Sequence, residues 1–227
     1  MIFTMINLLQ GAIDVDTSVF LFFNGAHSEF FDYFMKAYSG KWIWVPLYAT
    51  FLYVMIRNFT IKQTILCVIG LSLTIAFADQ ICATFIRPFV ERLRPANLDN
   101  PISPLVHIVG NYRGGSYGFP SCHAANTFGL AFFIFFLFKR YWLTFFIMSW
   151  AVLTCYSRIY LGVHYPGDLL AGMCVGFVGA SIMYFLFTRL SNYRRAERIH
   201  HVYSPILIGM ITIVCISAYS AHACLFT

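Results

Sequence analysis

The chain has 227 residues, of which 59% are hydrophobic, 19% aromatic and only 11% charged. Soluble domains carry about 25% charged residues, so this composition excludes an ordinary soluble protein and indicates an integral membrane protein. The net charge of +6 does not predict a nucleic-acid partner, because the basic residues do not form one patch with interleaved aromatic side chains.

The N-terminal region, residues 12–36, is rich in phenylalanine but is interrupted by acidic and amide side chains. This pattern fits a helix lying on the membrane surface better than one crossing the membrane. The opening MIFTMINLLQ has no basic region followed by a small-residue cleavage site. We therefore expect the first membrane span to act as the targeting signal as well.

Six later segments are apolar enough to cross a hydrocarbon core of about 30 Å as helices. They cover approximately residues 42–56, 63–86, 122–138, 141–160, 169–188 and 204–225. No internal repeat or low-complexity linker divides them, so residues 1–227 are expected to form one domain. The predicted fold class is all-α: a polytopic membrane bundle of about six transmembrane helices with an N-terminal interfacial helix. The seven cysteines lie mostly inside these spans and do not indicate a disulfide framework.

Charge predicts the orientation of the bundle. The loops 57–62, 139–140 and 189–203 together carry eight Lys or Arg residues and one acidic residue, Glu197, whereas the other side carries seven basic and eight acidic residues. Cytoplasmic loops are enriched in Lys and Arg. We therefore expect these loops to be cytoplasmic, and both termini and the long 87–120 loop to be outside.

Polar residues that suit catalysis gather in three short stretches, and counting the spans places all three on the same, outer face of the membrane. The stretches are IRPFVERLRP with Arg87 and Arg94, FPSCHAAN with Ser121 and His123, and YSRIYLGVHYPGDLL with Arg158, His164 and Asp168.

Together these residue types suit a phosphoryl group. Three arginines offer planar donors that match phosphate oxygens, and helix starts at Ser121 and Asp168 add free backbone N–H groups. One histidine can attack phosphorus while the other protonates the leaving oxygen. Asp168, four residues after His164, is placed to hold that imidazole in one tautomer.

Other interpretations of these residues also exist. His123, His164 and Asp168 are common metal ligands, but three nearby arginines would repel a divalent cation. Charges inside membrane spans often mark an ion or solute pathway, but here they lie at one membrane boundary, with Asp79 as the exception.

Several isolated residues have simpler explanations. An arginine near the end of a span, such as Arg92 or Arg113, ordinarily reaches toward lipid headgroups. We likewise expect the interfacial histidines His27, His107 and His222 to have no part in the chemistry.

The three stretches resemble the signature of the type 2 phosphatidic acid phosphatase superfamily of membrane lipid phosphatases. That signature is a basic residue, six residues and Arg-Pro, then Pro-Ser-Gly-His, then Ser-Arg, five residues, His, three residues and Asp. In this chain the elements span 87–95, 120–123 and 157–168, and the resemblance covers about residues 79–172.

The resemblance implies a six-helix fold with an extracytoplasmic site and no requirement for a metal or other cofactor. His164 would be the nucleophile that forms a phosphohistidine, Asp168 would orient it, and His123 would protonate the leaving group. The phosphoryl oxygens would be held by the side chains of Arg87, Arg94, Ser121 and Arg158 and by the backbone N–H of Cys122.

This chain departs from the family pattern at two positions. Arg87 replaces the usual lysine, which keeps the charge but changes its hydrogen-bond geometry. Cys122 replaces the usual glycine. Since a side chain strains a backbone with positive φ, we predict a helical φ at Cys122.

The stretches FFNGAHSEFFDYF and SCHAANTFGLA resemble bacterial envelope members of the family, including lipid A phosphatases and undecaprenyl pyrophosphate phosphatases. We therefore expect hydrolysis of a phosphate monoester or pyrophosphate on an envelope lipid, at the periplasmic or outer face of a bacterial inner membrane, with no nucleic-acid partner. Two alternatives stay open: a lipid phosphotransferase with the same intermediate, and a non-catalytic transporter or binding protein.

Overall fold

The structure is a computed structural model that describes residues 2–194 and 198–226. Arg195 and Glu197, which entered the charge comparison, lie outside the described residues. The α-helices are α1 (Ile2–Gly25), α2 (Glu29–Tyr38), α3 (Val45–Asn58), α4 (Ile61–Asp79), α5 (Arg87–Val90), α6 (Cys122–Phe138), α7 (Tyr141–Tyr160), α8 (Pro166–Ser191) and α9 (Ser204–Phe226). Short 3₁₀ turns cover Trp42–Trp44, Ser103–Leu105 and Val109–Asn111, and a π-helix covers Gln80–Ile86.

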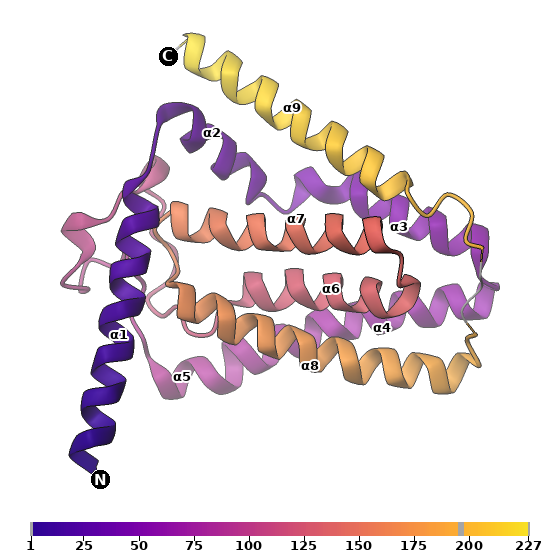
Figure 1. The fold of residues 1–227 in the computed structure, drawn as a ribbon, viewed down its shortest axis with the longest axis horizontal. Helices are drawn as coiled ribbons and strands as arrows, with labels where there is room; N and C mark the ends of the chain where they lie inside the picture. Colours follow the sequence, from indigo (N-terminus) through magenta and orange to yellow (C-terminus); the bar gives the residue numbers. More distant parts are fainter. Residues whose placement is uncertain (1, 195–197, 227) are drawn as a thin grey trace.

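The centre of the molecule is a helix bundle in which α6 packs against α4, α7 and α8 (Figure 1). More than half of the residues of α6 are buried, including Phe133, Ile134 and Leu137. The described ranges contain no β-strand, only an isolated bridge between Leu93 and Tyr117. The expected all-α membrane bundle is therefore confirmed.

Four helical segments are long and apolar enough to cross a membrane within the described part of the chain: Ile61–Val90, Tyr141–Tyr160, Pro166–Ser191 and Ser204–Phe226. Two of the six expected spans are shorter. The 122–138 segment forms the 17-residue helix α6, and the 42–56 segment forms the 14-residue helix α3 behind a 3₁₀ turn. All seven cysteines are free.

Small residues bring α6 and α8 into close contact. Gly172 and Gly176 lie one turn apart on α8, the small-residue spacing that lets membrane helices approach closely. A Cβ at Gly172 would overlap the carbonyl oxygen of Ser121, and one at Gly176 would overlap that of Ala125. The start of α6 is thereby fixed against the first turns of α8.

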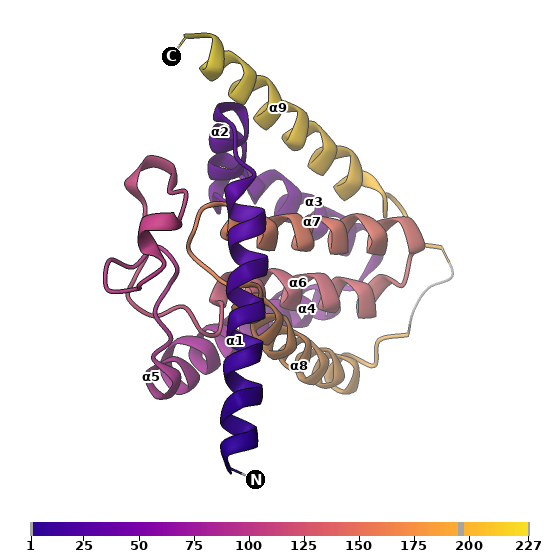
Figure 2. The same ribbon diagram turned by 60° about the vertical axis from the view of Figure 1, so that its left-hand side comes forward.

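The N-terminal region differs in detail from the single surface helix expected over 12–36. It forms two helices, because Ser28 caps the start of α2 by accepting a hydrogen bond from the Phe31 N–H. Helix α1 crosses the end of the bundle, transverse to α6, α7 and α8 (Figures 1 and 2). This orientation fits a helix lying along the membrane surface.

The long segment that joins α5 to α6, residues 91–121, is called the outer segment here and begins where the Ile61–Val90 helix ends. The helix continues through the π-helix Gln80–Ile86, then α5 stops at Glu91, which has a left-handed φ of 47°. Such π segments occur often at functional sites. Here the π-helix immediately precedes Arg87 and delivers it to the end of the bundle.

Candidate active site

The three predicted stretches come together at the end of the bundle that α1 crosses. The segment after α5, the start of α6 and the connection between α7 and α8 all lie at this end (Figure 1). The structure therefore brings the predicted residues to one end of the molecule, as counting the spans had indicated.

His164 and Asp168 form the predicted pair. His164, between α7 and α8, is 1% exposed, and Asp168, in the first turn of α8, is fully buried. The Nδ1 atom of His164 lies 3.3 Å from Oδ2 of Asp168, which also accepts the backbone N–H of Tyr165 at 3.1 Å. Since the carboxylate accepts, we assign the imidazole proton to Nδ1, which leaves the lone pair on Nε2.

That lone pair faces a cation. The Nη1 atom of Arg94 lies 2.8 Å from Nε2 of His164 and donates to the carbonyl of Val163 at 3.0 Å. Burial, and then the positive charges of Arg94, Arg158 and Arg87, hold the pKa of His164 well below its ordinary value. The imidazole is therefore neutral at neutral pH, as a nitrogen nucleophile requires.

Arg94 itself keeps its charge. Burial, together with the charges of Arg87 and Arg158, lowers its pKa to about 10. A guanidinium with this pKa is still protonated at neutral pH. Arg94 can therefore hold a phosphoryl oxygen directly beside the nucleophilic nitrogen.

The three predicted phosphate-binding arginines share a further property. Arg87, Arg94 and Arg158 each have a buried Nε–H without a hydrogen-bond partner among the described residues. Unpaired buried donors are costly, and they are rare in native structures. The three arginines therefore present unused donors together, an arrangement that suits a polyvalent anion.

Arg87 also contacts the residue that departs from the family pattern. Its Nη2 atom donates to the carbonyl of Pro120 at 3.0 Å and to the Cys122 Sγ at 3.1 Å. Cys122 is the first residue of α6 and does not have a positive φ, so the predicted helical backbone is confirmed. The thiol occupies part of the arginine's donor capacity.

Ser121 is the N-cap of α6. Its Oγ accepts the backbone N–H of Ala124 at 3.4 Å, and its own N–H donates to the carbonyl of Asp168 at 3.0 Å. The hydroxyl hydrogen remains able to donate to an anion. Ser121 therefore links the start of α6 to the start of α8.

His123 and Arg158 complete the predicted set. His123 lies half-buried in the first turn of α6, with Arg158 and His164 among its charged or titratable neighbours. Arg158, near the end of α7, is 4% exposed, and its Nη1 donates to the Ser39 Oγ. Its guanidinium also lies 5.9 Å from the ring centre of Tyr112, in the outer segment. Ser39 was not predicted, because nothing in its sequence neighbourhood indicates contact with α7.

The expectation for Arg92 is wrong. Instead of facing lipid, Arg92 donates to Asp168 Oδ1 at 3.0 Å and pairs with Asp16 Oδ2 at 2.7 Å. Its guanidinium carbon lies 3.9 Å from the ring centre of Tyr165. Its place two residues before Arg94, within the first motif, was the signal that could have found it.

Arg113 and His107 also have specific partners. Arg113 donates to the carbonyl of Ala96 and to the Ser103 Oγ, so it holds the outer segment together. The His107 ring stacks on His27 at 3.7 Å between centres, and its Nε2 lies 2.9 Å from a carboxylate oxygen of α2. These contacts join different segments of the chain.

Asn24 attaches α1 to the end of α7. It is 1% exposed, and its Nδ2 lies 2.9 to 3.1 Å from the carbonyls of His107, Ile159 and Tyr160. Its Oδ1 accepts the His107 N–H at 2.8 Å. Asn24, in the stretch FFNGAHS, therefore fixes the end of α1 next to the candidate site.

The alternative metal site is not formed. The part of the chain that the structure describes has no group of three His, Cys, Asp or Glu side chains placed to hold a metal ion. His123, His164 and Asp168 are therefore not arranged as a ligand set.

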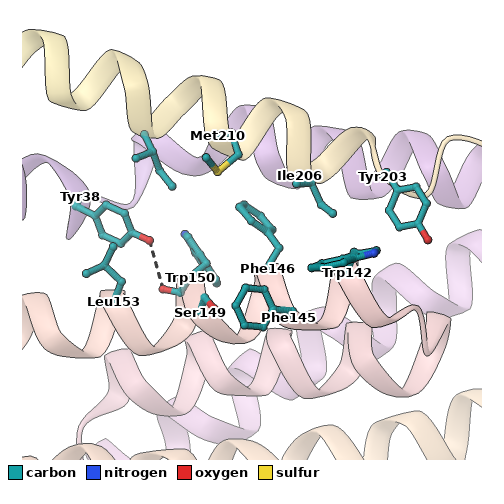
Figure 3. Close-up of a pocket in the computed structure, with 11 residues that line it drawn as sticks. Tyr38, Trp142, Phe145, Phe146, Ser149, Trp150, Leu153, Tyr203, Ile206 and Met210 are labelled. Carbon is teal, nitrogen blue, oxygen red and sulfur yellow. Dashed lines mark hydrogen bonds between the residues drawn. The ribbon is translucent and has the colours of Figure 1, made fainter.

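A separate cavity of about 560 Å³ lies between α7 and α9 and is lined mainly by aromatic and aliphatic side chains (Figure 3). The Tyr38 hydroxyl donates to the carbonyl of Trp150 at 3.5 Å along its edge. Among the described residues, its lining contains no charged side chain. This cavity has none of the groups that the candidate site brings together.

Comparison with known families agrees with this geometry. The model of the PAP2 superfamily matches residues 66–192, a range that contains all three motifs. The chain belongs to the PAP2 superfamily. The match extends beyond the 79–172 region expected from the motifs alone, because it includes most of α4 and all of α8.

Two bacterial relatives are similar over most of this PAP2 chain. The lipid A 4'-phosphatase of Bacteroides thetaiotaomicron is 54% identical over 184 residues, covering 81% of this chain and 82% of the relative. The lipid A 4'-phosphatase of Porphyromonas gingivalis is 33% identical, covering 80% and 77%. The crystal structure of LpxE from Aquifex aeolicus superposes with a TM-score of 0.55 at 21% identity, covering 74% of this chain and 93% of the other. This last similarity shows the shared fold.

Proposed function

We propose that this protein is a membrane lipid phosphatase that hydrolyses the phosphate ester of lipid A through a phosphohistidine on His164. One observation carries the proposal: a buried imidazole is held at Nδ1 by Asp168, and its Nε2 atom lies 2.8 Å from Nη1 of Arg94. Membership of the PAP2 superfamily and two lipid A 4'-phosphatase relatives support the same reaction class.

In the first half of the reaction, Nε2 of His164 attacks phosphorus and the bond from phosphorus to the lipid oxygen breaks. His123 gives its proton to that oxygen, so the lipid leaves as an alcohol. The phosphorylated imidazole is cationic and keeps its Nδ1 proton, which Asp168 stabilises. The unused donors of the three arginines bind the phosphoryl oxygens as charge develops on them.

In the second half, a water attacks phosphorus and His123 takes its proton. The bond from nitrogen to phosphorus breaks, inorganic phosphate leaves, and the lone pair returns to Nε2. His164 is then neutral again, in the state that its buried, cationic surroundings favour.

The substrate assignment rests on the relatives and on the position of the site. The site lies at the end of the bundle, beside the transverse helix α1, where a lipid phosphate at headgroup depth meets it (Figure 1). Similarity over about four-fifths of the Bacteroides lipid A 4'-phosphatase favours lipid A over other envelope lipids. The charge distribution of the loops favours a periplasmic site.

Phosphate release by the purified protein in detergent tests this proposal. The substrates are lipid A, a polyprenyl pyrophosphate and phosphatidic acid, each with the wild type and with His123→Ala. For the wild type, we expect the highest kcat/KM with lipid A as the substrate. For His123→Ala, we expect no phosphate release. Preferred release from the pyrophosphate would overturn the substrate assignment, and full turnover by His123→Ala would overturn the mechanism.

Two further arms address the alternative activities. Adding a candidate alcohol acceptor separates a phosphatase from a phosphotransferase, since only the latter forms a new phosphate ester at the expense of free phosphate. Binding of lipid A without any release would identify a binding protein or transporter.

A further inference from the structure

Asp168 has a second partner that the reaction scheme above does not use. Its Oδ2 atom serves His164 and the backbone of Tyr165, whereas its Oδ1 atom lies 3.0 Å from Nη1 of Arg92. The carboxylate is fully buried. An isolated buried carboxylate is expensive to keep ionised, so this direct ion pair with Arg92 stabilises the charged form that orients His164.

Helix α1 provides a second carboxylate partner for Arg92. Its Nη2 atom lies 2.7 Å from Oδ2 of Asp16, and Oδ1 of the same carboxylate accepts the Gly167 N–H at 2.8 Å. A Cβ at Gly167 would come within 2.8 Å of Asp16, so glycine permits this close approach. Asp16 therefore connects α1 to both Arg92 and the first turn of α8.

The flat face of the guanidinium is also occupied. It stacks on the Tyr165 ring at 3.9 Å, and the Tyr165 hydroxyl accepts a hydrogen bond from Asn100 Nδ2 at 3.0 Å. Asn100 in turn donates to the Arg94 carbonyl at 3.0 Å. Arg92 is therefore held by two carboxylates and an aromatic ring in one orientation.

This environment differs from that of the phosphate-binding arginines. Arg87, Arg94 and Arg158 keep a buried donor without a partner among the described residues, whereas both terminal nitrogens of Arg92 are paired with carboxylates. A guanidinium neutralised by two carboxylates attracts a phosphate poorly. The contacts of Arg92 therefore suit the orientation of Asp168 rather than the binding of substrate.

We propose that Arg92 is a positioning residue for phosphoryl transfer, and that Asp16 of the interfacial helix holds it in place. The inference rests on the proposed function, because it assigns Arg92 a role through Asp168 and His164. Helix α1 thereby contributes to the chemistry without touching the reacting atoms.

The test measures kcat and KM for phosphate release from lipid A with Arg92→Gln, Arg92→Lys and Asp16→Asn. In metal sites, loss of the carboxylate or carbonyl partner that orients a ligating histidine reduces activity on the order of 10- to 100-fold, and we take this range for the analogous role of Arg92. We expect Arg92→Gln to lower kcat by this amount with KM unchanged, and Arg92→Lys to recover part of the loss. A raised KM with unchanged kcat would mean that Arg92 binds substrate, and would overturn the proposal.

A double-mutant cycle tests the role of Asp16. Asp16→Asn keeps an oxygen for the Gly167 N–H but loses the ion pair, so we expect a smaller decrease in kcat. In the Arg92→Gln background the same change should have no further effect, because the two residues act as a unit. Fully additive losses would show that Asp16 does not act through Arg92.

Two controls separate the possible failures. Arg113→Gln removes another arginine of the outer segment, whose hydrogen bonds among the described residues go to Ala96 and Ser103, and it should leave kcat unchanged. His164→Ala in the same assay tests the proposed function itself. If His164→Ala is inactive and Arg92→Gln behaves as wild type, only the positioning role fails. If Arg92→Gln does not fold, as judged by thermal unfolding, Arg92→Lys and Asp16→Asn still decide the question.

Discussion

The candidate active site and the cavity between α7 and α9 lie in the same helix bundle but contain opposite kinds of side chain. The cavity is lined by groups such as Phe145, Phe146 and Trp150, whereas the site buries Arg158, His164 and Asp168. Apolar side chains can line a hollow without leaving any polar group unpaired, whereas buried charges persist only where partners or a ligand compensate them. Buried charge is therefore a better guide to the chemistry here than the volume of a hollow.

The largest expected effect distinguishes these two regions directly. His164→Ala removes the proposed nucleophile and should reduce kcat for phosphate release on the order of 10⁴-fold or more, as loss of a nucleophile does in enzymes with covalent intermediates. Ser149→Ala, which changes a polar residue of the aromatic cavity, should leave kcat within the error of the assay. Comparable losses in both variants would contradict the assignment of the chemistry to the bundle end.

Arg94→Gln should have the next largest effect. It removes a charged donor beside the nucleophile, a change that lowers kcat on the order of 10²- to 10³-fold in comparable sites. It also removes one of the cations that hold the pKa of His164 low, so that pKa rises and the imidazole becomes protonated at a higher pH.

The pH profile of kcat/KM tests whether Arg94 controls the protonation of His164. The titratable or charged groups around His164 include Asp168, His123 and the three arginines Arg87, Arg94 and Arg158. In the wild type, activity should persist below pH 6.5, because His164 remains neutral there; in Arg94→Gln, the acidic limb should move to higher pH. An acidic limb at the same pH in both proteins would show that Arg94 does not control the protonation of His164.

A smaller effect should follow from closing the contact between α6 and α8. Gly172→Ala places a Cβ against the Ser121 carbonyl oxygen, and overpacking of this kind costs about 1–3 kcal/mol. We expect a lower thermal unfolding temperature together with reduced activity, because the start of α6 must shift. Gly11→Ala is the matched control, since a Cβ there meets no atom of the described residues within 4 Å apart from its own helix backbone; equal unfolding temperatures for the two variants would refute the close-contact argument.

The smallest expected effect concerns Cys122, which lies beside Arg87. A thiol reagent should attach a group next to the phosphate-binding arginine and inhibit, whereas Cys122→Gly should stay active and resist the reagent. Cys174→Ser, which removes an exposed thiol on α8, should not protect. Inhibition that persists in Cys122→Gly would place the sensitive thiol elsewhere.

The spacing of the motifs predicted much of the site because local geometry depends on sequence separation. Four residues between His164 and Asp168 place the two groups within reach of each other, and the observed distance of 3.3 Å agrees. The helix start at Ser121 was likewise predicted from its sequence and forms the N-cap of α6. The roles of these residues in binding and catalysis stay predictions.

The sequence was less informative where partners lie far apart in the chain. Arg92 was assigned to the lipid headgroups, because an arginine near a span end ordinarily reaches them, but Asp16 and Asp168 lie 76 residues away from it on either side. No local pattern indicates such pairs. Only the packing of α1 across the bundle brings the first of them into place.

The sequence by itself determined the membrane class, the helical fold and the motifs that identify the PAP2 superfamily, since these depend on composition, apolar run length and short spacings. The tertiary structure decided which arginines keep a free donor, which arginine supports Asp168, and how α1 joins the site. Those properties arise from long-range contacts between buried charges, and each depends on the exact position of a partner that the sequence separates by tens of residues.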